Sequence, residues 1–209
     1  LALVSLANPL RATDRSHSFN PQDVIATARR LSEAPFEPRA KVPKDWWRLT
    51  YEEYQTRWFR SRGALWSKTN RSYNVDFFLP GLYFPRAVQM HQVADGKAHP
   101  LPFELSLFDK TDKAPDLGTD GALGSSGFRM RPELSEPGKK TEFCVFQGAS
   151  YFRAIGSNNN YGLSARGLAV KTADPAGEEF PEFTKFWLEA PVPGQKNMVV
   201  HALMDSPSV

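Results

Sequence analysis

The sequence predicts a mainly β protein, an antiparallel β-sandwich preceded by two short helices. Its 17 prolines and 14 glycines divide the 209 residues into short segments, which suits strands and turns better than long helices. Hydrophobic residues make up 41% of the chain and aromatic residues 12%, the composition of a folded domain with a sizeable core. Beyond the first third, short stretches that alternate apolar and polar side chains follow one another, separated by turn-forming residues.

Two helices are expected in the first third of the chain. Asn20 can cap the first helix, Pro21 suits its first position, and Pro35 stops it. Thr50 can begin the second helix, because Glu53 follows three residues later and completes a capping box. Three aromatic residues would share one side of this second helix, as core residues or as a platform for a sugar: Tyr51, Tyr54 and Trp58.

The pattern changes from helical to alternating after these helices. Residues 73–79 alternate apolar and polar side chains, as in a half-buried strand. Pro80 and Gly81 then indicate a turn, and residues 83–93 are the expected partner strand, whereas residues 110–127 are expected to form a loop. Five further strands are expected at residues 142–147, 150–155, 161–172, 183–189 and 197–204.

Both ends of the chain are expected to be cut. The strand at 197–204 lies almost at the end of the chain, where a core strand would need a partner from further along. Residues 1–18 begin without Met on an apolar stretch and continue with small and polar residues, like the end of a secretory signal peptide. A disordered or strand-forming N-terminus fits that pattern equally. No apolar run approaches the roughly 18 residues that a membrane span requires.

Charge, cysteine content and motifs exclude several classes of function. The formal net charge is only +3, and the densest basic cluster, at residues 57–62, is interleaved with aromatic residues as in a packed helix, so no nucleic acid is expected. Cys144 is the only cysteine, which excludes an intrachain disulfide and a cysteine metal site. There is no P-loop, dinucleotide fingerprint or nucleophile elbow, and the four histidines lack metal-ligand spacing. Neither a cofactor nor a metal is expected.

Polar residues interrupt two of the buried strands, at 148–153 and 161–169. Small residues on both faces of the second segment leave room beside the strand for a ligand or for a packed neighbour. Arginine provides planar donor forks and tyrosine provides a ring with a hydroxyl, which together suit the apolar faces and dense hydroxyls of a sugar. The candidate carbohydrate-binding residues are Tyr151, Arg153, Tyr161, Ser164 and Arg166.

A purely structural role for these arginines is the alternative. Strict alternation places Ser164 and Arg166 on one face of their strand and Tyr161 on the other. A buried arginine on that face could pair with Glu178, Glu179 or another carboxylate and hold the sandwich together.

Five short blocks in the last third of the chain follow the order and spacing of a known family. The first block, residues 146–156, reads Phe-Gln-Gly-Ala-Ser-Tyr-Phe-Arg-Ala-Ile-Gly. Together the blocks resemble the MdoG/OpgG/OpgD family of periplasmic glucan-biosynthesis proteins. The chain departs from the family pattern at Ser125 and Ser126, where Phe-Ala is usual, and at Lys171, where an acidic residue is common. The other four blocks are residues 161–170, 177–181, 186–189 and 202–207.

The resemblance implies a two-domain protein of which this chain is the N-terminal part. Residues 1–18 would be a signal-peptide remnant and disordered lead. Residues 19–209 would be an incomplete part of a large β-sandwich glucan domain, similar to the supersandwich of galactose mutarotase. The smaller immunoglobulin-like domain of the family would be absent from the chain.

The resemblance also implies a role in making osmoregulated periplasmic glucans, whose backbone is β-1,2-linked glucose. Family members resemble inverting glycoside hydrolases, which need one carboxylic acid and one carboxylate. Those groups are expected beyond Val209, so no residue of this chain is named as catalytic. The full-length protein would cleave or transglycosylate β-1,2-glucan; the alternative is a non-catalytic glucan-binding or scaffold protein that assists backbone synthesis.

The resemblance places the protein in the periplasm. Its expected partners are a β-1,2-linked glucan, the membrane-bound machinery of glucan synthesis, and a second copy of the chain in a homodimer.

Overall fold

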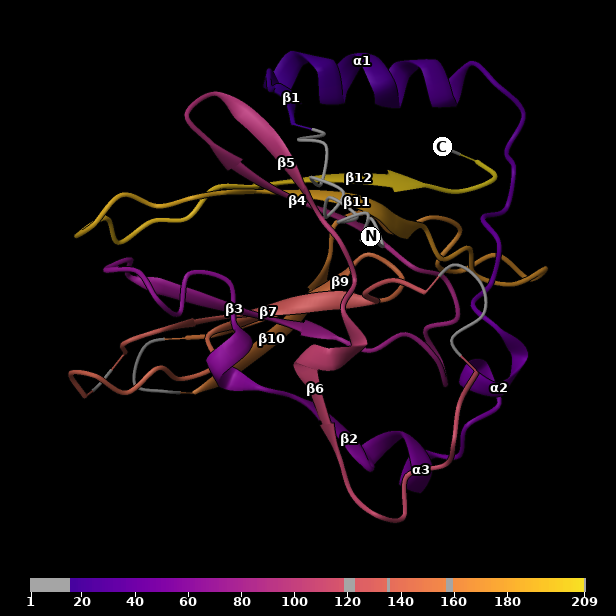
Figure 1. Cartoon of the computed structure of the whole chain (residues 1–209). Coiled ribbons are helices and arrows are strands. Elements are labelled where there is room, and N and C mark those ends of the chain that lie inside the picture. Colours follow the sequence, from indigo (N-terminus) through magenta and orange to yellow (C-terminus); the bar gives the residue numbers. More distant parts are fainter. Residues whose placement is uncertain (1–15, 119–122, 135, 157–159, 209) are drawn as a thin grey trace, which may run out of the picture.

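Two five-stranded β-sheets lie face to face and form a sandwich (Figure 1). The computed structural model describes residues 16–118, 123–134, 136–156 and 160–208. Sheet 1 has the strand order β1 (His17–Ser18), β5 (Lys97–Leu101), β4 (Gln89–Ala94), β11 (Glu182–Glu189) and β12 (Val200–Asp205). Sheet 2 has the order β10 (Tyr161–Arg166), β9 (Tyr151–Ile155), β8 (Cys144–Gln147), β7 (Gly127–Pro132) and β3 (Tyr73–Phe78).

The strands of both sheets pair antiparallel except at one place. β4 and β11, in the middle of sheet 1, run parallel, with Phe186 opposite Met90. The predicted mainly β sandwich is therefore confirmed, with one parallel pair within it. A separate two-stranded ribbon joins β2 (Arg57–Phe59) to β6 (Phe108–Lys110).

Aromatic side chains fill the space between the two sheets. Phe128 of β7 is fully buried and stacks on Phe146 of β8, with ring centroids 5.1 Å apart. From sheet 1, the fully buried Phe186 meets Phe128 edge to face at 5.0 Å. Because alternate residues of a strand point to the same face, this packing fixes which side chains of sheet 2 point outward.

Helix α1 (Pro21–Ser32) covers the outer face of sheet 1, as the view in Figure 1 shows. Asn20 caps it, because its side chain accepts a hydrogen bond from the backbone N–H of Gln22 at 3.0 Å. Val24 and Leu31 of this helix pack with Phe19 against a small core on β4, β5, β11 and β12. β11 is therefore covered on both faces, which explains why the consecutive residues Phe186, Trp187 and Leu188 are all buried. The first predicted helix is confirmed.

The second predicted helix is shorter than expected. Thr50 and Glu53 form the predicted capping box, but α3 (Tyr51–Gln55) ends after five residues. Trp58 consequently lies in β2 and not on the side of a helix, and it is 49% exposed. A further helix, α2 (Lys44–Trp47), was not predicted; its Trp46 is completely buried.

The predicted hairpin between residues 73–79 and 83–93 is wrong. β3 pairs with β7, and β4 begins only at Gln89 and lies in the other sheet. The backbone after the turn is held elsewhere: the N–H of Leu82 donates to the carbonyl of Trp46 at 3.1 Å, and Pro85 accepts from Val42 at 2.7 Å. These non-local bonds redirect the chain from one sheet to the other.

The ends of the chain also differ from the expectation in detail. His17–Ser18, the last residues of the expected lead, form β1 and pair with β5, whereas residues 1–15 lie outside the described residues. β12, expected to need a partner from outside the chain, pairs antiparallel with β11. The helices that the structure describes are all too short or too polar to cross a lipid bilayer.

Replacing Phe186 by Ala should lower the free energy of unfolding by about 3–5 kcal/mol, because the change leaves a cavity between the sheets. Chemical denaturation measures this difference. Ile25→Ala, at a side chain that is 53% exposed on α1, is the control and should change stability by less than about 0.5 kcal/mol. A loss of less than about 1 kcal/mol for Phe186→Ala would contradict the central position of this ring.

Candidate functional site

A straight row of side chains crosses the outer face of sheet 2. Asp76 on β3 is paired with Arg129 on β7, which is paired in turn with Val145 on β8. The row continues through Arg153 on β9 to Ser164 on β10. On β3, β7 and β8 the neighbours of these residues along the strand face the core, so the row points outward. Its polar members are the starting point of the candidate site.

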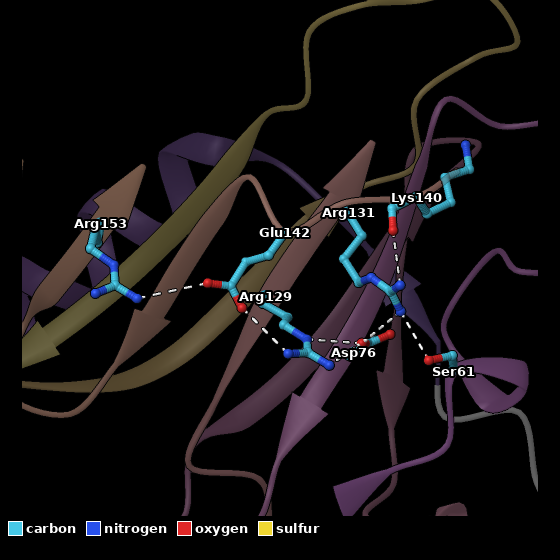
Figure 2. A network of polar contacts seen from close by, with 7 residues as sticks. All are labelled: Ser61, Asp76, Arg129, Arg131, Lys140, Glu142 and Arg153. Carbon is cyan, nitrogen blue, oxygen red and sulfur yellow. Dashed lines mark hydrogen bonds and ion pairs between the residues drawn. The ribbon is translucent and has the colours of Figure 1, made fainter. Parts of the chain in front are cut away.

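Asp76 is the centre of a network of charges on this face (Figure 2). Its side chain is only 1% exposed, and its Oδ2 accepts from Arg129 Nε at 2.9 Å and from Arg131 Nη1 at 3.2 Å. Its second oxygen, Oδ1, is buried and has no hydrogen-bond partner among the described residues. Transferring an ion from water to the protein interior costs roughly several kcal/mol, so a buried carboxylate needs such cations beside it.

The network extends in both directions from Asp76. Arg129 Nη1 also donates to Glu142 at 3.3 Å, and the other oxygen of Glu142 lies 3.7 Å from Arg153 (Figure 2). On the opposite side, Arg131 donates to the hydroxyl of Ser61 at 3.0 Å and to the carbonyl of Lys140 at 2.9 Å. The arginines are thus oriented by fixed acceptors. Arg153, at the end of the network, remains 47% exposed.

Tyrosines and arginines alternate where the network reaches β9 and β10. Tyr151 lies opposite Arg166, whose guanidinium stands 5.4 Å above the tyrosine ring. Arg153 stands 5.0 Å above the ring of Tyr161. Strict alternation would have kept Tyr161 on the other face, but the register shifts between Tyr161 and Ser164. This bulge, which the sequence did not reveal, brings Tyr161 to Arg153.

Arg166 has the structural partner that the sequence left open as an alternative. Its Nη1 forms an ion pair with Glu178, and this hydrogen bond raises the pKa of Arg166 above its usual value. Glu178 lies just before residues 180–183, which form one wall of the pocket described next. Arg166 therefore has both a structural partner and a tyrosine ring within reach.

A pocket of about 520 Å³ opens beside β9 and β10. Three of the five predicted residues line it: Tyr151, Arg153 and Ser164. Two further exposed rings also line it, Tyr83 at 76% and Phe180 at 48%. The pocket is large enough for a sugar-sized ligand and offers aromatic faces together with arginine donors. Tyr161 and Arg166 do not line it but pack against residues that do.

A second carboxylate shared by two arginines forms the far wall of this pocket. Glu182 accepts from Arg39 Nη2 at 3.2 Å and from Arg86 Nη1 at 2.9 Å. Arg39 also donates to the carbonyls of Ala87 and Phe183, and burial lowers the pKa of its guanidinium. These bonds join the segment after α1, the loop before β4 and the start of β11. The wall is therefore held by side chains from three distant parts of the chain.

Sequence reasoning missed most of the charged residues that build the site. One signal was available: Asp76 is a charged residue between the apolar residues Val75 and Phe77 of a strand. The missed residues are Asp76, Arg129, Arg131, Glu142, Arg39, Arg86 and Glu182. Within the described ranges, no group of three His, Cys, Asp or Glu side chains could hold a metal ion.

Comparison with known proteins identifies the family. The family model described as "Periplasmic glucan biosynthesis protein, MdoG" matches residues 19–209. The chain belongs to this family. The MdoG match covers α1, all of sheet 2 and all of sheet 1 except β1, and thus the whole candidate site.

Individual MdoG relatives agree with the family model. The chain is 43% identical to Glucans biosynthesis protein G of Rhodopseudomonas palustris over 201 residues, 95% of this chain and 40% of the relative. It is 41% identical to the protein of that name from Bradyrhizobium diazoefficiens, over 91% of this chain and 38% of the relative. The corresponding protein of a Shewanella species is 40% identical, over 97% of this chain and 37% of the relative. The chain therefore spans about 40% of the length of the curated relatives it matches.

Replacing Asp76 by Asn should lower the free energy of unfolding by about 3 kcal/mol, because it leaves two arginines without their shared buried carboxylate. Denaturant titration at neutral pH measures the loss. The exposed Asp112 provides the control, and Asp112→Asn should leave stability unchanged. Equal stabilities of the two variants would show that the network does not hold this face.

Glu179 makes the stability of the pocket wall depend on pH. Hydrogen bonds from Ser206 and Ser208, together with Lys171, lower the pKa of Glu179 to about 2. A glutamate in an unfolded chain has a pKa of about 4.3. The stabilisation of the fold by charged Glu179 is therefore complete above about pH 5 and is lost as the pH falls towards 2. The segment from Glu178 to Glu182 is thereby fastened to the residues after β12 in the charged state of Glu179.

The Glu179→Gln variant should unfold more easily than the wild type at pH 7, and the difference should shrink as the pH falls from 5 to about 2. Unfolding free energies of both proteins, measured by denaturant at each pH, give this difference. Asp112→Asn, at an exposed carboxylate of the loop after β6, controls for the loss of one negative surface charge. A difference that stays constant over this pH range would contradict the low pKa of Glu179.

Proposed function

We propose that this chain provides a glucan-binding surface in a periplasmic protein that acts in glucan biosynthesis. The observation that carries the proposal is the alternation of arginines and tyrosines at the β9–β10 end of sheet 2, next to the pocket. Sugar rings present apolar CH groups to aromatic faces and hydroxyls to charged donors, and this surface offers both. The relatives' name, Glucans biosynthesis protein G, supports a glucan as the ligand class.

The proposed ligand is a β-1,2-linked glucan, and the surface would hold several consecutive glucose units. Arg153 would donate to sugar hydroxyls, because it is half exposed and its ion-pair contact with Glu142 is long, at 3.7 Å. Tyr151, 40% exposed in the pocket wall, would stack on a sugar face. Ser164, opposite Arg153, would add a hydroxyl to the same row. Tyr161 and Arg166 would support these residues from the edge strand.

The described carboxylates of this surface do not suggest an acid and a base for hydrolysis. Asp76 and Glu142 are each bound to two arginines, and Glu178 is bound to Arg166. An inverting glycosidase needs one carboxylic acid that donates a proton and one carboxylate that activates water. The proposal therefore assigns binding to this chain, and assigns cleavage or transglycosylation of β-1,2-glucan to carboxylates in the rest of the full-length protein.

A non-catalytic scaffold for glucan synthesis is the second candidate. The carboxylates named above are all bound to arginines. This favours a scaffold, because a surface that only binds glucan needs no free carboxylic acid. In that function the protein would hold the growing glucan near membrane-bound synthesis machinery, as a monomer or a homodimer. Both candidates share the binding surface and the periplasmic location.

Replacing Arg153 or Arg166 by Ala should weaken binding of linear β-1,2-glucan to the full-length protein by about tenfold, the effect of losing one charge-assisted hydrogen bond. Calorimetric titration measures the affinity, and thermal melting verifies the fold. Arg29→Ala removes an exposed arginine of α1, which covers the other sheet, and should leave affinity unchanged. Unchanged affinity in both variants with an intact fold would favour the structural role of these arginines.

Incubation of the full-length protein with linear β-1,2-glucan should release shorter glucans, which chromatography detects. The same assay with Arg153→Ala should show a higher KM and a similar kcat at saturation, since the residue is proposed to bind and not to react. Tight glucan binding without any products would eliminate the hydrolase function and leave the scaffold.

A further inference from the structure

A second pocket, of about 630 Å³, lies at the opposite end of β7 from the first. β7 begins at Gly127, beside Ser126 of the first pocket, and ends at Pro132, which lines the second. The remaining walls come from the residues before β3, the residues before β8, and the connection between β11 and β12. This pocket is thus separate from the proposed glucan surface.

The charges around this pocket are unbalanced towards the positive. Arg71, Lys140 and Lys196 line it, together with a single carboxylate, Glu133. Glu133 pairs with Lys140 at 3.4 Å, and a hydrogen bond from the backbone of Gly138 and the same lysine lower its pKa. No carboxylate of the described residues forms an ion pair with Arg71 or Lys196. Arg71 and Lys196 therefore have no negatively charged partner among the residues that the structure describes.

Hydrogen bonds to backbone carbonyls hold the guanidinium of Arg71 and the backbone of Lys196. Arg71 Nη1 donates to the carbonyl of Pro191, and the hydroxyl of Tyr73 donates to the carbonyl of Lys196. The loop between them is closed by Gln195, whose side chain accepts from the N–H of Val192 at 3.0 Å. One donor of the Arg71 guanidinium is thus used, and the described residues provide no hydrogen-bond acceptor for its other donors. The Lys196 ammonium is on an exposed residue whose backbone is held.

Part of the pocket lining is apolar. It consists of Tyr73, which is 7% exposed, Phe143, Pro132 and Leu134, which is 39% exposed. Burial raises the pKa of Tyr73, so its phenol is neutral at neutral pH and does not repel an anion. A lining that combines apolar residues with cations suits a molecule that has a hydrocarbon or ring body and a negatively charged end.

We propose that this pocket is a binding site for a small organic anion, with a phosphate or carboxylate group between Arg71 and Lys196. The planar fork of Arg71 would bind two oxygens of the anionic group, and Lys196 would add a point charge. The body of the ligand would lie on Phe143 and Leu134. This inference does not depend on the proposed glucan function, because no residue that is proposed to contact the glucan lines this pocket.

Phenyl phosphate tests this site in the full-length protein, because it combines an apolar ring with a phosphate. Calorimetric titration at constant ionic strength should show saturable one-to-one binding, weaker binding of inorganic phosphate, and none of phenol. Lys196→Ala should raise the Kd of phenyl phosphate about tenfold, the effect of one lost charge-assisted contact. Lys139→Ala, at an exposed lysine that does not line the pocket, is the matched control and should leave the Kd unchanged.

Two results would overturn the proposal. One is the absence of saturable phenyl phosphate binding; the other is a Lys196→Ala variant that binds as tightly as Lys139→Ala. Arg71→Gln gives a second measurement, although it also removes the contact with Pro191. Lys196→Ala remains decisive if Arg71→Gln does not fold, because Lys196 holds the loop through its backbone and not through its side chain. Affinity for β-1,2-glucan should stay unchanged in the lysine variants.

Discussion

The carboxylate of Asp76 is the one charge on which the outer face of sheet 2 depends. It lies on β3, is completely shielded from water, and binds arginines that project from the neighbouring strand β7. Arg129 also donates to Glu142, and Glu142 in turn forms an ion pair with Arg153 at the edge of the pocket. A buried ion needs its partners to remain in place, so the network restricts the arginine side chains to a few positions.

The same arrangement occurs on the other wall of the pocket, where Glu182 binds Arg39 and Arg86. In both places one carboxylate holds two arginines: those on Asp76 both project from β7, whereas those on Glu182 come from two different segments of the chain. Partly exposed ion pairs contribute only about 0–1 kcal/mol each to stability, so orientation is the more important consequence. The proposed glucan surface between these walls is therefore preorganised, and binding requires little ordering of side chains.

Local signals in the sequence were sufficient to predict the elements, but not their neighbours. Asn20 and the pair Thr50 and Glu53 act within one helical turn, so their caps could be predicted. The partner of β3 could not, because the bonds that redirect the chain after Gly81 involve Trp46 and Val42, far away in sequence. The bulge before Ser164 and the arginines around Asp76 likewise depend on strand pairing, whereas Tyr151 and Arg153 were visible as polar residues within an apolar strand.

Hydrogen–deuterium exchange of the full-length protein, with and without linear β-1,2-glucan, tests the proposed surface most directly. The account predicts that glucan slows exchange in peptides covering β9 and β10 and in the loop around Tyr83, while peptides covering α1 on the opposite face are unaffected. Slowed exchange that spared β9 and β10, with glucan bound, would contradict the account and place the glucan site elsewhere in the protein.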